Sequence, residues 1–152
     1  MFLTILAIGR TKKGPLTSVF DQYVSRINWP IELHELVIKA PLSGSQRIKK
    51  EGSLLLSHIK NTVFLVALDP TGKQLSSPNF ASQLSRWRDD GVNKVTFLIG
   101  GSNGLDDAIL SRAHFVISFG VMTWPHMLIR TMLVEQIYRA QCILLGHPYH
   151  RG

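Results

Sequence analysis

The chain has 152 residues, the size of one domain with a single core. Its hydrophobic fraction of 45% argues against global disorder, and seventeen lysines and arginines against ten acidic residues give a formal net charge of +7. This surplus favours a polyanionic partner, of which nucleic acid is the commonest. The charge leaves one alternative open, a protein that is merely soluble and basic.

The single cysteine, Cys142, cannot form an internal disulfide, which fits a reducing compartment. The opening segment, MFLTILAIGRTKK, places its apolar run before its basic residues, the reverse of a secretory signal. No apolar run reaches the length of a membrane span. The sequence therefore predicts a cytoplasmic protein without a membrane partner.

Short apolar runs alternate with helical patterns along the chain. The runs are rich in β-branched and aromatic residues, and they predict strands over residues 2–9, 31–38, 62–69, 94–101 and 114–120. Helices are expected over roughly residues 15–27, 44–59, 78–90, 105–112 and 125–143. Ser77 is the expected N-cap of the third helix, with Pro78 in its first position. Without a linker or repeat, residues 1–152 form one α/β domain, with a mostly parallel sheet covered by helices on both faces.

The last predicted helix is apolar around nearly its whole circumference. The apolar residues are Met127, Leu128, Ile129, Met132, Leu133, Val134, Ile137 and Ala140. Such a helix must be buried on all sides, and a domain this small covers one face with its sheet. We therefore expect a homodimer packed through this helix, most simply with two-fold symmetry. The alternative is a central helix enclosed within a monomer.

Residues 97–105, FLIGGSNGL, place a glycine pair directly after a predicted strand. Ligands of open α/β sheets bind beyond the carboxyl ends of strands, and glycine lets a ligand approach the backbone closely. The stretch is not the dinucleotide fingerprint, because Ser102 and Leu105 occupy two of its glycine positions. A plain turn is the alternative interpretation.

Residues 117–130, ISFGVMTWPHMLIR, form a second loop that leaves a strand and enters the last helix. Two such loops can together enclose a small molecule. His126 and Arg130 are one helical turn apart and share a face, although such a pair is more often a surface contact than a catalytic one.

The C-terminal segment, GHPYHR, is unusual because terminal residues are normally small and featureless. Tyr149, His150 and Arg151 can stack on rings, move protons and bind anions. The spacing of His126, His147 and His150 matches no standard zinc site, so no metal is predicted.

The basic residues form several separate groups. They are Arg10, Lys12 and Lys13 after the first strand, Arg47, Lys49 and Lys50 in the second helix, and Arg86 and Arg88 in the third. Each group can be a solvated face, and together they would suit contacts with a phosphate backbone.

Three ordered motifs resemble one family. FLIGGSNGL, then MTWPHMLIRTMLVEQIYRA, then GHPYHR are similar to the RlmH family of SPOUT methyltransferases, and the AIG near the start and the KEG at residues 50–52 extend the similarity. The resemblance implies a SPOUT-type α/β fold with a C-terminal deep trefoil knot, an exception to the unknotted rule. It also implies a homodimer that uses S-adenosylmethionine to methylate N3 of a pseudouridine in large-subunit (23S) ribosomal RNA on the assembled ribosome.

The resemblance also implies positions for the sites. The cofactor would contact Leu68, Gly100, Phe119, Gly120, Val121, Met122, Thr123 and Trp124. The C-terminal segment would lie over the active site near the dimer interface. Many members carry Ser-Lys where this chain has Gly120-Val121, and Phe where Trp124 stands. Backbone groups and apolar walls hold the adenine in such loops, so cofactor binding is expected to survive.

The residue types suggest roles in such a reaction. Arg151 and Arg130 can favour the anionic form of the pseudouridine imide, His150 or His126 can take its proton, and Tyr149 can stack on the base or bond to it. Glu135 and Arg139 are expected to form a structural pair. The alternatives are a SPOUT enzyme that acts on transfer RNA and a non-catalytic, ribosome-associated RNA-binding protein.

Overall fold

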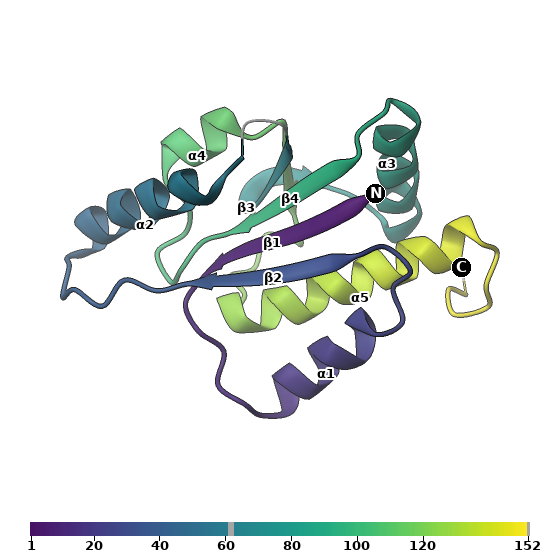
Figure 1. The fold of residues 1–152 in the computed structure, drawn as a ribbon, viewed down its shortest axis with the longest axis horizontal. Coiled ribbons are helices and arrows are strands. Elements are labelled where there is room, and N and C mark those ends of the chain that lie inside the picture. The colour runs from purple at the N-terminus through teal and green to yellow at the C-terminus, as the bar shows by residue number, and fades with distance from the viewer. Residues whose placement is uncertain (61–62, 152) are drawn as a thin grey trace.

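The computed structural model describes residues 1–60 and 63–151. Parallel strands form one five-stranded sheet in the order β2-β1-β4-β3-β5 (Figure 1). The strands are β1 (Phe2–Ile8), β2 (Ile31–Leu36), β3 (Phe64–Gln74), β4 (Lys94–Ile99) and β5 (Phe115–Ser118). The expected parallel α/β sheet is thus confirmed, although the predicted first residue of the third strand, Thr62, lies outside the described residues.

The helices cover both faces of the sheet. They are α1 (Pro15–Val24), α2 (Gly44–His58), α3 (Ser77–Asp89), α4 (Asp107–Arg112) and α5 (His126–Leu144). Strand side chains alternate between the faces, so Leu3 and Ile5 of β1 join the core under α1, α3 and α5, whereas Leu6 and Ile8 join the core under α2 and α4.

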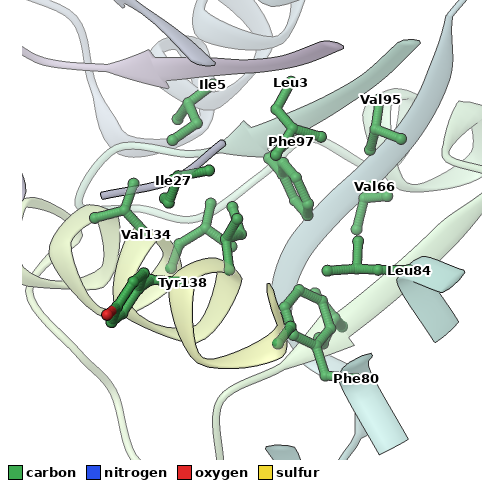
Figure 2. Packing of buried hydrophobic residues seen from close by; sticks show 14 of the residues in the cluster. Leu3, Ile5, Ile27, Val66, Phe80, Leu84, Val95, Phe97, Val134 and Tyr138 are labelled. Carbon is green, nitrogen blue, oxygen red and sulfur yellow. The ribbon is translucent and has the colours of Figure 1, made fainter. Parts of the chain in front are cut away.

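The larger core lies between the sheet and the helices α3 and α5 (Figure 2). Phe97 of β4 is fully buried at its centre. The same cluster includes Leu3, Val66, Val95, Phe80, Leu84, Val134 and Tyr138. This packing fixes the middle of α5 against the sheet.

The third strand is longer than predicted. The Asp-Pro-Thr-Gly of residues 69–72 has the composition of a turn and ended the predicted strand, but Lys73 and Gln74 pair again with β5. Leu68 and Lys73 both lie opposite Ile117, so the intervening residues bulge out of the ladder. A Cβ at Gly72 would be 2.6 Å from the carbonyl carbon of Ile117, so this close approach requires glycine.

The N-cap prediction for the third helix is wrong by one residue. Ser76 is the N-cap, and its Oγ accepts a hydrogen bond from the backbone amide of Asn79 at 3.3 Å. Ser77 and Pro78 are therefore the first two helical residues. Both serines suit a cap, and only the hydrogen bond distinguishes them.

The last helix is largely covered within one chain. Leu133, Val134, Ile137 and Ala140 are fully buried, and α1 and α3 flank the helix on its two sides. The flanking helices therefore cover part of the surface that was expected to need a partner, whereas Met127 and Ile129 remain only partly buried. Leu128 and Met132 are only partly buried. The homodimer stays a prediction.

Among the described residues, no helix is long and apolar enough to cross a bilayer.

Candidate active site

A cavity of about 420 Å³ lies at the carboxyl edge of the sheet. Residues 68–70 of β3, residues 99–102 and 104 at and after the end of β4, and residues 117–120 and 122–126 from β5 into α5 enclose it, together with Ile129. Parallel strands present their carboxyl ends at one edge, so segments distant in sequence meet there. Seven of the eight residues expected to contact a cofactor line this cavity: Leu68, Gly100, Phe119, Gly120, Met122, Thr123 and Trp124. Val121 does not line it and is 83% exposed.

The glycine pair after β4 forms one wall of the cavity. A Cβ at Gly100 would lie 2.4 Å from the carbonyl oxygen of Gly104, a distance that only glycine allows. The amide of Gly104 donates to the carbonyl of Gly101 at 3.1 Å, and Gly104 has a φ of +84°. This wall therefore consists of closely packed backbone, which a ligand can approach without meeting side chains.

The loop after β5 forms the opposite wall. The Ser118 hydroxyl donates to the carbonyl of Gly120 at 2.9 Å, and Gly120 has a φ of +116°. The Trp124 indole donates to the carbonyl of Phe119 at 3.2 Å, so the loop folds back on itself. Val121 is exposed, so its side chain does not form part of this wall.

His126 is the first residue of α5 and lines the cavity. A Cβ at Gly9 would be 3.0 Å from its Nε2, so the ring packs against the end of β1. Burial lowers the pKa of His126, and the nearby Arg130 cation lowers it further. The imidazole is therefore neutral at pH 7 and can accept a proton.

Arg130 lies one turn further along α5 but does not face the cavity. Its side chain is 1% exposed. Nη1 donates to Glu35 Oε1 and to the Thr11 hydroxyl, each at 2.7 Å, and Nη2 donates to the carbonyls of Ile8 and Gly9 at 2.6 and 3.0 Å. The expectation that Arg130 supplies charge to a nucleobase is not supported, because its charge is buried and neutralised by Glu35.

The C-terminal segment is held against the protein. The Tyr149 hydroxyl donates to Glu135 Oε1 at 2.9 Å and lies 3.1 Å from the Tyr23 hydroxyl, and the Arg139 guanidinium lies 4.7 Å from the Tyr149 ring centroid. Burial and these hydrogen bonds raise the pKa of Tyr149 well above its usual value, so the phenol stays protonated. His150 Nδ1 lies 3.4 Å from Arg139 Nη1, and Arg151 is exposed.

The predicted Glu135–Arg139 pair is present, since Arg139 Nε donates to Glu135 Oε1 at 2.9 Å.

Glu135, which binds Tyr149, lies nine residues from His126, which is about 14 Å along a helix. Figure 1 shows the C-terminal segment at the end of α5 opposite to the strand ends. A second hollow of about 510 Å³ lies beside Tyr23 and Glu135 and shares residues 117–120 with the first cavity. Within one chain, the C-terminal segment therefore does not cover the candidate active site.

Sequence reasoning assigned no role to Glu51, a buried carboxylate behind the glycine wall. Glu51 of α2 is 4% exposed, and its Oε2 has no hydrogen-bond partner among the described residues. A Cβ at Gly101 would be 2.7 Å from that oxygen. Burial raises the pKa of Glu51, whereas Arg47, with Nη1 3.6 Å from Oε1, opposes the shift. The available signal was its position, since Glu51 shares a helix face with the buried Leu55.

No group of three or more His, Cys, Asp or Glu side chains is placed to share a metal ion in residues 1–60 and 63–151. That finding covers His126, His147 and His150, the three histidines considered from the sequence.

Solved structures share the fold. The SpoU methyltransferase AviRb from Streptomyces viridochromogenes, in complex with the cofactor AdoMet, superposes with a TM-score of 0.51 at 13% identity, covering 93% of this chain and 61% of AviRb. A putative RNA methyltransferase from Bacillus anthracis also gives a TM-score of 0.51 at 13% identity, covering 97% of this chain and 96% of that one. At this identity, both structures show only that the fold is shared.

Sequence comparison is more specific. Residues 1–150 match the family described as "Predicted SPOUT methyltransferase". A protein of Paramagnetospirillum magneticum is 48% identical over 151 residues, and one of Rhodospirillum centenum is 45% identical over 152 residues, covering 99% and 100% of both chains respectively. Each is named "Ribosomal RNA large subunit methyltransferase H". The chain therefore belongs to the SPOUT methyltransferase family and, within it, to the RlmH family.

Proposed function

We propose that this protein is an S-adenosylmethionine-dependent methyltransferase that methylates N3 of a pseudouridine in large-subunit (23S) ribosomal RNA. It would act in the cytoplasm as a homodimer on the assembled ribosome. The observation that carries the proposal is the cavity at the carboxyl edge, because three sequence-distant segments bring seven of the eight expected cofactor residues to one place. The names of the relatives support ribosomal RNA as the substrate.

The cavity residues fit S-adenosylmethionine. The backbone wall at Gly100 and Gly104 has no side chains in front of it, so a flat adenine ring can approach it closely. Leu68, Ile99 and Ile117 supply apolar surface for the ring. The cofactor of AviRb, a protein of the same fold class, adds support.

S-adenosylmethionine supplies a methyl group already activated by its sulfonium. The protein then has to align the nucleophile and exclude water. The imide of the base is a better nucleophile after it loses its N3 proton, and His126, neutral and at the cavity wall, is the group best placed to accept that proton.

The homodimer gives the C-terminal segment a role. Each chain holds its own Tyr149 near Glu135, about 14 Å along α5 from His126, so a second copy would bring Tyr149, His150 and Arg151 to the cavity rim. Arg151, which is exposed, would then favour the imide anion. The trefoil knot implied by the family belongs to the same proposal.

The decisive experiment is methyl transfer to ribosomes that lack the modification, followed by mass spectrometry of nucleosides and fragments from the recovered RNA. The proposal expects one methylated pseudouridine in the large-subunit RNA. A methylated transfer RNA would favour the other SPOUT activity. No transfer, together with no S-adenosylmethionine binding by calorimetry, would favour the non-catalytic RNA-binding protein.

A further inference from the structure

We propose that two basic segments beside the cavity bind the phosphate backbone of the RNA whose base enters it. The surface, here called the basic edge, consists of Arg10, Lys12, Lys13, Lys39, Arg47, Lys49 and Lys50. The inference rests on the proposed function and adds to it by naming where the substrate lies.

The whole net charge of the protein comes from the basic edge. Residues 9–20 and 37–50 contain these seven lysines and arginines and no aspartate or glutamate. The other ten basic residues are matched by the ten acidic residues of the chain, so the remainder is neutral in sum. Such a concentration of one sign of charge creates a directed field for a polyanion.

The fold places the basic edge beside the cavity. β1 and β2 are parallel neighbours, so the segments that follow them leave the sheet at its carboxyl edge, as do the segments that enclose the cavity (Figure 1). Two glycines of the segments that carry these charges lie close to the cavity residue His126 and to Asn103 in the loop after β4. A Cβ at Gly9 would lie 3.0 Å from Nε2 of His126, and a Cβ at Gly44 would lie 3.3 Å from Nδ2 of Asn103.

The charges of the basic edge are available to a ligand. Within residues 1–60 and 63–151, Arg47 is its only member with a carboxylate oxygen within 4.0 Å. Elsewhere in the protein, Arg88, Arg130 and Arg139 are each paired with an acidic side chain. Lys12, Lys13, Lys39, Lys49 and Lys50 are exposed. Unpaired, exposed lysines are suited to phosphates, which lysine binds as a point charge without fixed geometry.

The opposite side of the cavity offers no comparable charge. Residues 119–125, FGVMTWP, contain no ionisable side chain. A nucleotide whose base enters the cavity carries its flanking phosphates over the neighbouring surface, and the basic edge is the neighbouring surface that can neutralise them. The geometry therefore points to a path for the RNA strand that crosses the ends of β1 and β2.

The test compares two pairs of charge-neutralising substitutions with a matched control. Lys12→Gln/Lys13→Gln and Lys49→Gln/Lys50→Gln each remove two charges from the basic edge. Arg86→Gln/Arg88→Gln removes two charges from exposed positions of α3, so the control protein has the same net charge as each basic-edge variant. Each protein is assayed with ribosomes that lack the modification, at salt concentrations from about 50 to 200 mM. Co-sedimentation with those ribosomes measures binding without catalysis.

Each basic-edge pair is expected to raise KM for ribosomes about tenfold. The logarithm of the binding constant falls linearly with the logarithm of the salt concentration, and the magnitude of this slope should decrease by about one for each phosphate that is no longer neutralised. The KM for S-adenosylmethionine and the control pair should stay at wild-type values. Unchanged ribosome binding in both basic-edge pairs, or an equal loss in the control, would overturn the inference. If the wild-type protein binds ribosomes through these lysines but transfers no methyl group, the proposed function fails while the binding surface stands.

Discussion

Arg130 and Glu35 form a 2.7 Å ion pair that joins the first turns of α5 to the end of β2, an edge strand of the sheet. The guanidinium also binds the carbonyls of Ile8 and Gly9 at the end of β1. These contacts fix the N-terminal end of α5, and with it His126, relative to the strand ends that enclose the cavity.

Replacing Arg130 with Met should destabilise the fold by about 3–5 kcal/mol, because it removes one partner of a largely buried pair and leaves Glu35 uncompensated. Urea denaturation measures the loss. The double variant Arg130→Met/Glu35→Gln should recover part of it, since no unpaired charge is left. A loss below about 1 kcal/mol in the single variant would contradict the structural role of this pair.

Glu51→Gln should change how stability depends on pH. Because burial raises the pKa of Glu51, the folded state binds this proton more tightly than the unfolded state. The resulting contribution to the free energy of unfolding is fully present below the pKa that Glu51 has in the unfolded chain. It is lost as the pH rises through the pKa that Glu51 has in the folded protein. Glutamine cannot ionise, so the stability of Glu51→Gln relative to wild type should increase from about pH 4 to about pH 8. Urea unfolding at three pH values, with the exposed Glu32→Gln as control, measures the trend. A difference in free energy of unfolding between Glu51→Gln and wild type that stays constant with pH would contradict this prediction.

Gly100→Ala should weaken S-adenosylmethionine binding about tenfold or more, because relieving a 2.4 Å contact with the carbonyl oxygen of Gly104 must displace the cavity wall. Calorimetry measures the affinity. Gly14→Ala is a suitable control, since its Cβ would meet its nearest atom at 3.9 Å. Equal affinities for Gly100→Ala and wild type would mean that this wall does not hold the cofactor.

His126→Gln should reduce kcat about 10²- to 10⁴-fold if the imidazole accepts the imide proton. In the wild type, kcat should decline toward acid pH with a midpoint below 6.5, because burial and Arg130 lower the pKa of His126. The variant should lack this decline. A pH–rate profile that keeps the same acid limb after substitution would assign the proton to another group.

Alanine at His150 or Arg151 should strongly reduce methyl transfer while leaving the protein folded, because neither side chain belongs to the buried core. Tyr149→Phe should cost about 1 kcal/mol of stability, since it removes the hydrogen bond to Glu135. Tyr149→Ala is expected to reduce turnover as well. Sedimentation gives the oligomeric state, and methyl transfer to ribosomes gives the activity. Unchanged turnover in all three alanine variants would remove the C-terminal segment from the mechanism.

The sequence predicts the strands well because each is a short apolar run with a clear end, and the parallel sheet then brings Leu68, Gly100 and the loop from Phe119 to one edge. The extension of β3 beyond Asp69 is not predictable in this way. Its residues have turn composition, and they rejoin the sheet only through the close contact between Gly72 and Ile117.

Side-chain roles are harder to predict than backbone positions. Spacing places His126 and Arg130 on one helical face, but it does not show that one lines the cavity and the other is buried against Glu35. Glu35 and Glu51 attracted no interpretation because an isolated carboxylate in sequence is usually solvated. Their burial depends on elements far away along the chain.

The seven basic residues of residues 9–20 and 37–50, with no acidic residue among them, make the charge distribution an electric dipole whose positive end lies at the segments that follow β1 and β2. A freely tumbling protein with this dipole turns this end toward a polyanion before contact, which increases the fraction of productive collisions. Added salt shortens the range of this torque to roughly 8 Å at physiological ionic strength. Association with a large anionic particle is thus oriented in dilute buffer and becomes increasingly random as ionic strength rises.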